Sequence, residues 1–140
     1  MKIGNNTKIW EHVNLYGDVE IGENCSIGSF CDIGGGVKIG NNVKIQAHSF
    51  IPSGVTIEDN AFIGPGVVFT NDKYPSSKEY GKKMETIVRN GASIGANATI
   101  LCGIEIGSNA KIGAGSVVTK SIPPNVVACG NPARIKAGKS

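Results

Sequence analysis

Apolar residues recur at every sixth position over most of the chain. The series runs unbroken from Ile3 to Phe69 and resumes, in a shifted register, from Val88 to Val118. It comprises 18 positions, which we call anchors, and 14 of them are isoleucine. The position four residues after an anchor is mostly small or β-branched. A six-residue period fits neither an α-helix nor a strand with plain alternation, and it predicts short strands separated by corners.

The corners have their own signature in the sequence. The third residue after most anchors is Asn or Gly, the residue types that adopt positive φ at low cost. Three such corners close one triangular coil, so 18 residues form one turn of a parallel β-helix. We therefore predict an all-β fold of about six 18-residue coils, stacked around a narrow core. One loop, at about residues 70–87, leaves the coils where the register shifts.

Corner residues 18 positions apart should line one edge of the coils. One edge is a series of asparagines, and a second carries Asp18, Gly36, Gly54 and Asp72. The third edge departs from turn chemistry, because its corners are His12, Phe30, His48 and Gly66. Trp10 and Gln46 belong to the same edge, directly after an anchor, where Gly is typical. We interpret this edge as the working surface; packing against a neighbouring subunit is the alternative explanation for its histidines.

Composition supports the fold and excludes several classes. Glycine takes 20 of 140 positions, and 18 isoleucines stand against two leucines, which argues against a helical bundle. The net charge of +3 does not indicate a nucleic-acid partner. No signal-like or membrane-spanning apolar run is present, so we expect a soluble, cytoplasmic protein without a membrane partner. The four cysteines form no CxxC pair, and we expect reduced, buried thiols and no metal site.

The repeat resembles that of a known family. The pattern Ile21-Gly22-Glu23-Asn24-Cys25-Ser26, which recurs over residues 3–69 and 88–123, is similar to that of the hexapeptide acyltransferase superfamily. Residues 123–134 resemble the segment that closes those transferases. The resemblance implies a single-stranded left-handed parallel β-helix over residues 1–123, with a closing segment and tail at 124–140. It also implies a homotrimer with active sites between subunits.

The resemblance also implies a donor. In this superfamily acetyl-CoA lies in a cleft between subunits and is a co-substrate that needs no metal. Small residues on the late coils would admit its pantetheine arm, and basic residues near the C-terminus would meet its phosphates; a solvated basic tail is the alternative. The implied donor-binding residues are Gly95, Ala96, Gly113, Ala114, Lys120 and Arg134, with Lys136 and Lys139 nearby.

Residues 44–50 and 69–75 resemble one branch of the superfamily more specifically. That branch acetylates the 3-amino group of UDP- or dTDP-linked amino sugars used in surface polysaccharides. In such a reaction Asn71 would position the amine, and His48 would assist as a general base. The expected substrate-binding residues are Trp10, His12, Gln46, Asp72, Lys73 and Tyr74.

Three other functions fit parts of the pattern. A sugar O-acetyltransferase of the same superfamily would make His48 indispensable, because a hydroxyl needs a base to attack a thioester. A γ-class carbonic anhydrase shares the fold, but that chemistry resembles a three-histidine zinc site and the chain has two histidines. A trimeric, non-catalytic β-helix scaffold is the third alternative.

Overall fold

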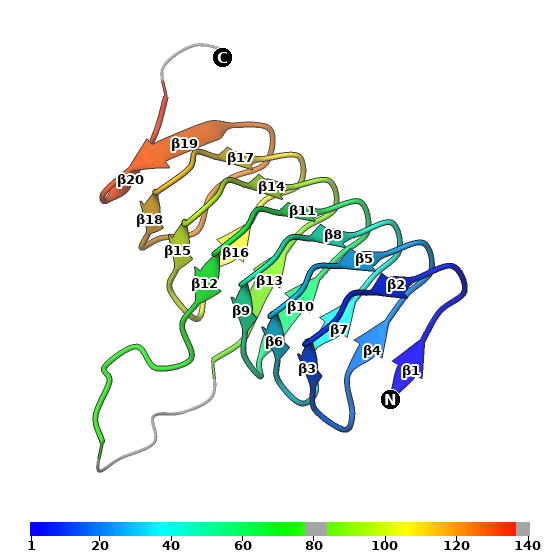
Figure 1. Cartoon of the computed structure of the whole chain (residues 1–140). Coiled ribbons are helices and arrows are strands. Elements are labelled where there is room, and N and C mark those ends of the chain that lie inside the picture. The colour runs from blue at the N-terminus through cyan, green and yellow to red at the C-terminus, as the bar shows by residue number, and fades with distance from the viewer. Residues whose placement is uncertain (78–83, 137–140) are drawn as a thin grey trace.

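The computed structural model describes residues 1–77 and 84–136, and every regular element within them is a β-strand. No helix able to cross a membrane occurs among these residues. Successive short strands fall in turn on three sheets, so that the chain winds into a triangular solenoid (Figure 1). Sheet A contains β1 (Lys2–Ile3), β4 (Glu20–Ile21), β7 (Lys38–Ile39), β10 (Val55–Ile57), β13 (Thr86–Val88) and β16 (Glu105–Ile106).

The other two sheets follow the same order along the axis. Sheet B contains β2 (Lys8–Ile9), β5 (Ser26–Ile27), β8 (Lys44–Ile45), β11 (Phe62–Ile63), β14 (Ser93–Ile94), β17 (Lys111–Ile112), β19 (Val127–Gly130) and β20 (Ala133–Ile135). Sheet C contains β3 (Asn14–Leu15), β6 (Asp32–Ile33), β9 (Phe50–Ile51), β12 (Val68–Phe69), β15 (Thr99–Ile100) and β18 (Val117–Val118).

Strands 18 residues apart pair in parallel, as the period predicts. Ile3 lies beside Ile21, and Ile21 lies beside Ile39. The strands β1–β18 make six complete coils, and β19 begins a partial seventh. The predicted all-β parallel solenoid is therefore confirmed, while its left-handedness stays an expectation from the resemblance.

The anchors form the core. From Val19 to Ala128 the anchors and their partners are almost completely buried, apart from the partly buried Ile104, and Phe69 is the largest side chain inside. The first coil is the exception, because no coil covers it on its outer side: Ile3 is 45% exposed. Cys25, Cys31 and Cys102 are buried free thiols as expected, whereas Cys129 in β19 is half-buried.

The loop is shorter than predicted. β12 ends at Phe69 and β13 begins at Thr86, so the excursion covers residues 70–85 and not 70–87. Thr86 is buried and pairs with Val55, because the coil closes before the next anchor, Val88. Residues 70–77 project away from the solenoid in Figure 1, and residues 78–83 lie outside the described part of the chain.

The closing segment extends sheet B. β19 pairs in parallel with β17, and β20 folds back antiparallel on β19. The hairpin lies at the end of the solenoid opposite β1 (Figure 1). Arg134 is thereby fixed on the last strand of sheet B, the same sheet that carries Trp10 at the other end.

Candidate functional site

The three edges of the solenoid share one backbone conformation but not one type of side chain. We name each edge by the sheets that it joins. On edge A/B, positive φ falls on Asn6, Asn24, Asn42, Asn60, Gly91, Asn109 and Asn125. On edge B/C it falls on His12, Phe30, His48, Gly66, Asn97 and Gly115. The alignment of corners predicted from the sequence is therefore confirmed.

Edge A/B is held together by hydrogen bonds between coils. The amide nitrogen of Glu23 donates to Asn41 Oδ1 at 2.8 Å, and that of Asn41 donates to Asp59 Oδ1 at 2.7 Å. One coil further on, the Asn90 nitrogen donates to Glu58 Oε1 at 3.1 Å. These side chains serve the backbone of the neighbouring coil, which is a structural role.

Edge B/C instead carries a stack of three aromatic rings. The rings of His12 and Phe30 are 5.1 Å apart between centroids with an angle of 14°, and those of Phe30 and His48 are 5.1 Å apart at 8°. All three residues have φ between 62° and 65° and are exposed, Phe30 by 55%. Placing a residue other than Gly or Asn in the left-handed backbone conformation costs roughly 1–2 kcal/mol. One contact between aromatic rings stabilises the fold by about 0.5–1.5 kcal/mol. Turn preference therefore does not explain these three residues.

Trp10 and Gln46 lie on the outer face of sheet B, directly beside this stack. Both line a groove of about 490 Å³ that runs across the first four coils. The Trp10 indole is 49% exposed, its Nε1 donates to Ser26 Oγ at 3.4 Å, and Lys8 Nζ lies 4.0 Å from the ring centroid. Four of the predicted substrate-binding and catalytic residues, Trp10, His12, Gln46 and His48, are thus brought together on one strip of surface.

The loop residues lie elsewhere on the same chain. Asn71 follows β12 on edge C/A, where the Thr70 hydroxyl accepts a hydrogen bond from the Cys102 nitrogen at 3.0 Å. Asp72 is half-buried, while Lys73 and Tyr74 are exposed and in contact, with Nζ 5.7 Å from the ring centroid. Sheet C separates edge C/A from edge B/C, so one chain does not bring Asn71 and His48 together.

The late coils continue edge B/C beyond the ring stack. Gly95, Ala96, Gly113 and Ala114 follow β14 and β17 and run up to the open corner at Gly115. Gly95 and Gly113 are already required by coil stacking, since a Cβ would lie 2.6 Å from the Ala114 nitrogen or 2.8 Å from Cys129 Cβ. These glycines alone are therefore no sign of a ligand.

The basic residues near the C-terminus are a stronger indication of a polyanionic ligand than these glycines are. Lys120 and Arg134 are exposed, as is Lys136. Among the described residues none of the three has a carboxylate within 4 Å. They lie at the C-terminal end of the solenoid and leave three uncompensated positive charges for phosphate groups. Lys139 lies outside the described residues.

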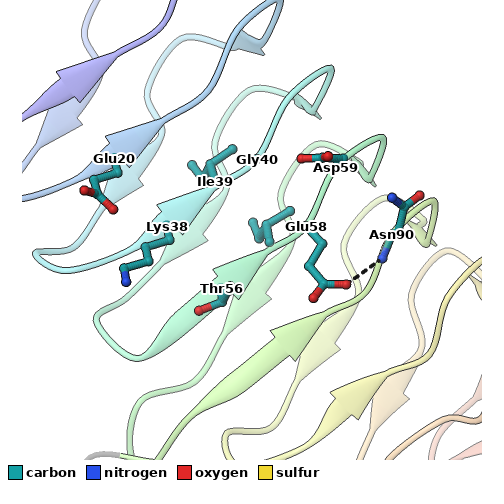
Figure 2. A pocket seen from close by; sticks show the side chains of 9 residues that line it. Glu20, Lys38, Ile39, Gly40, Thr56, Glu58, Asp59 and Asn90 are labelled. Carbon is teal, nitrogen blue, oxygen red and sulfur yellow. Dashed lines mark hydrogen bonds between the residues drawn. The ribbon is translucent and has the colours of Figure 1, made fainter.

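A second pocket, of about 390 Å³, lies on sheet A (Figure 2). Its carboxylates are already engaged: Glu58 accepts from the Asn90 nitrogen, as Figure 2 shows, and from Arg89 at 3.0 Å. Arg89 also pairs with Glu105, and these two hydrogen-bonded carboxylates raise the pKa of the guanidinium, that of Glu105 most. None of the residues expected from the sequence to act on a substrate lines this pocket.

No group of three His, Cys, Asp or Glu side chains within residues 1–77 and 84–136 could hold a metal ion. Lys8 and Lys44, which flank Trp10 and Gln46 on sheet B, are not among the residues expected from the sequence. The 18-residue spacing of Lys8, Ser26 and Lys44 was the available signal.

Comparison with known proteins identifies the class. The chain matches the family described as bacterial transferase hexapeptide (six repeats) over residues 1–35, 22–53, 36–71 and 85–120, and it belongs to that family.

This chain is similar in sequence to two curated proteins. One is the galactoside O-acetyltransferase of Escherichia coli (strain K12), 37% identical over 86 residues, or 58% of this chain and 42% of that protein. The other is the dTDP-3-amino-3,6-dideoxy-alpha-D-galactopyranose 3-N-acetyltransferase of Aneurinibacillus thermoaerophilus. It is 54% identical over 51 residues, 36% of this chain and 27% of that protein. The matched stretches thus span less than half the length of either relative.

Solved structures share the fold over nearly the whole chain. AntD, an N-acyltransferase from Bacillus cereus in complex with dTDP and 3-hydroxybutyryl-CoA, has a TM-score of 0.87 at 23% identity, covering 99% of this chain and 83% of that one. The acetyltransferase domain of PglB from Neisseria gonorrhoeae FA1090, in complex with acetyl coenzyme A, has a TM-score of 0.81 at 18% identity, with 93% and 57% covered. At these identities the likeness establishes the fold alone.

Proposed function

We propose that the protein transfers an acetyl group from acetyl-CoA to the amino group, at C3, of a nucleotide-linked amino sugar. The observation that carries this proposal is edge B/C itself. Its early coils present aromatic and imidazole side chains at a cost in backbone energy, and Arg134 and Lys136, which have no carboxylate within 4 Å among the described residues, lie in or directly after β20, the last strand of sheet B. Lys120 follows β18 on edge C/A, the edge that also carries Asn71. Two similar proteins support this choice of acceptor and donor: the dTDP-3-amino-3,6-dideoxy-alpha-D-galactopyranose 3-N-acetyltransferase, and the N-acyltransferase AntD in complex with dTDP and 3-hydroxybutyryl-CoA. UDP and dTDP are the two candidate nucleotides.

The chemistry is a direct transfer between two bound substrates. The amine nitrogen attacks the thioester carbonyl, a C–N bond forms, the C–S bond breaks, and coenzyme A leaves as the thiolate. The proton lost by nitrogen passes to a base and finally to the thiolate or to solvent. Asn71 holds the amine in line, and His48, whose imidazole edge is exposed, assists in removing the proton. Asp72, Lys73 and Tyr74 complete the acceptor site beside Asn71.

The site requires more than one chain. Asn71 lies across sheet C from His48, so the two meet when the loop of one chain reaches edge B/C of another. The outer face of sheet C supports such packing, because it carries the apolar side chains Phe50, Val68 and Val117, with Val68 38% exposed. We propose a homotrimer with three such clefts.

A thiol-release assay over a panel of nucleotide-linked sugars tests the function. We expect coenzyme A release with dTDP- or UDP-linked 3-amino sugars and little with 4-amino sugars or with hydroxyl acceptors. A chain that releases no thiol with any amino sugar, although acetyl-CoA raises its melting temperature, does not have the proposed activity. We place the reaction in the cytoplasm, where acetyl-CoA is available, as a step toward surface polysaccharides.

Sugar O-acetylation is the second candidate, because one relative is the galactoside O-acetyltransferase. A hydroxyl is a weaker nucleophile than an amine, so His48 would then be obligatory. Release of thiol with simple galactosides, combined with complete loss of activity in His48→Ala, would favour this reaction over N-acetylation.

A further inference from the structure

The groove on sheet B has a composition that the transfer chemistry does not require. It is lined by Trp10, Ser26, Gly28, Lys44, Ile45, Gln46, Ala47 and Pro65. Neither His48 nor Asn71, to which the proposed reaction assigns the proton transfer and the positioning of the amine, is among them. The groove is therefore a candidate binding surface.

The walls of the groove are set by the 18-residue period. Trp10, Gly28 and Gln46 occupy the same position in three successive coils, because β2 pairs with β5 and β5 with β8. Neighbouring strands are about 4.8 Å apart, so Trp10 and Gln46 stand on the order of 10 Å from each other. Gly28 between them cannot carry a side chain, since its Cβ would lie 2.6 Å from the Ala47 nitrogen. The result is a bare backbone floor, wide enough for one planar ring, between an indole and an amide.

Trp10 is the apolar element of this groove. Its ring is half exposed, and its Nε1 donates a long hydrogen bond of 3.4 Å to Ser26 Oγ in the next coil. The Lys8 ammonium covers the ring at 4.0 Å, a cation–π contact that is weak at an exposed site. A flat ring that stacks on the indole would gain more area than the ammonium does. The indole is thus available to an incoming aromatic ligand.

Two lysines lie at the groove: Lys44 lines it, and Lys8 covers the Trp10 ring. Lys8 and Lys44 occupy equivalent positions two coils apart on the same face of sheet B, with the Ser26 hydroxyl between them. Neither lysine has a carboxylate within 4 Å in the described part of the chain. Two unpaired ammonium groups beside a stacking surface favour a ligand that carries an aromatic ring and a polyanion together.

From these contacts we propose that the groove binds the nucleoside diphosphate of the acceptor. The base stacks on Trp10, the Gln46 amide hydrogen-bonds the polar atoms of the base, and Lys8 and Lys44 bind the two phosphates. Lys8 turns from the indole to the phosphate as the base takes its place. This assignment rests on the proposed function for the nature of the acceptor, and it adds Lys8, Lys44 and Ser26 to the substrate site. It also fixes the direction of the acceptor: nucleotide at the first coils, sugar toward His48 and the late coils.

The single tryptophan makes the proposal directly testable. Titration of the whole protein with dTDP, and separately with UDP, should quench the Trp10 emission saturably. Thymidine and inorganic pyrophosphate, each lacking one half of the ligand, should bind at least about tenfold more weakly. In calorimetry, Lys8→Met and Lys44→Met should each weaken dTDP binding by about tenfold and leave thymidine binding unchanged. Lys38→Met, the same substitution at the equivalent strand position on sheet A, is the matched control and should not change dTDP binding.

The outcomes separate this proposal from the proposed function. If dTDP and UDP bind in calorimetry without changing the Trp10 emission, or if both lysine variants bind as tightly as the wild type, the groove is not the nucleotide site. If thiol is released with nucleotide-linked amino sugars but neither nucleotide binds, the groove assignment fails while the transferase function survives. If dTDP or UDP binds as described but no amino sugar releases thiol, the groove assignment stands and the transferase function fails.

Discussion

Edges A/B and B/C are built on the same backbone and carry opposite kinds of side chain. At Asn24 and Asn42 the corner φ is 58°, and at Phe30 and His48 it is 64° and 65°. Asparagine adopts this conformation at little cost, whereas phenylalanine and histidine do so less readily. The same corner conformation is thus occupied by a suitable residue type on edge A/B and by less suitable types on edge B/C.

The difference separates structure from function within one repeat. Edge A/B adds side-chain hydrogen bonds that link each coil to the next, as from the Asn41 nitrogen to Asp59. Edge B/C replaces such links by exposed rings in contact. The three rings at corners that Asn would suit better support the proposal that edge B/C binds substrate.

The largest expected effect is on catalysis at His48. His48→Ala should lower acetyl transfer by about 100-fold, because a positioned base contributes about 10²–10⁴-fold. Rates of thiol release with acetyl-CoA and a nucleotide-linked 3-amino sugar measure the effect. An unchanged rate would remove His48 from the mechanism.

On edge A/B the effect should be on stability instead. Asn42→Ala forces a residue with a Cβ and no polar group into positive φ, which costs about 1 kcal/mol and lowers the melting temperature by about 3–5 °C. Acetyl transfer at 25 °C should be unchanged. Asn42→Gly is the matched control and should melt close to the wild type. Loss of acetyl transfer in a folded Asn42→Ala variant would contradict a purely structural role for edge A/B.

Arg89 tests whether the sheet A pocket next to edge A/B is also structural. Arg89→Met removes the pairs with Glu58 and Glu105, both at the surface. We expect a fall in melting temperature of no more than about 2 °C, which 1 M salt should erase, because exposed ion pairs are weak and screened. Thermal scans at low and high salt measure this. Impaired acetyl transfer in the folded variant would instead assign that pocket a function.

The smallest expected effect concerns Cys31, which should not react with an alkylating reagent in the native protein. Cys31 follows Phe30 in the sequence and is buried. Burial raises the pKa of its thiol, so that it stays protonated and unreactive at neutral pH. Alkylation of the native protein, mapped by mass spectrometry, should therefore modify half-buried Cys129 first and Cys31 only on unfolding. Alkylation of both at similar rates would mean that the ring-bearing edge opens.

The period alone predicted most of the fold. Anchor spacing gave the strands, the sheets and the alignment of His12, Phe30 and His48, because in a solenoid each position contacts the one 18 residues away. The end of the loop was two residues off, since the period carries no information inside an insertion.

The site was less accessible from the sequence. Trp10 and Gln46 could be placed on the working edge because they stand directly after an anchor, where Gly is typical. The groove could not be predicted, because it depends on the orientation of the Trp10 ring and on the unpaired lysines around it. Side-chain orientation is set by local contacts, here with Ser26 and Lys8, that no repeat pattern encodes. In the proposed homotrimer the relation of Asn71 to His48 depends on packing between chains, which a single sequence does not specify.

One variant tests the central claim that edge B/C is the working edge. Replacing His12, Phe30 and His48 together by Asn makes its early corners equivalent to those of edge A/B. The variant should keep its fold, with a melting temperature within about 5 °C of the wild type, because Asn suits the conformation while two ring contacts are lost. Measured by thiol release with acetyl-CoA and a nucleotide-linked 3-amino sugar, its acetyl transfer should fall by at least about 100-fold. A folded variant whose transfer rate stays within about threefold of the wild type would contradict the claim.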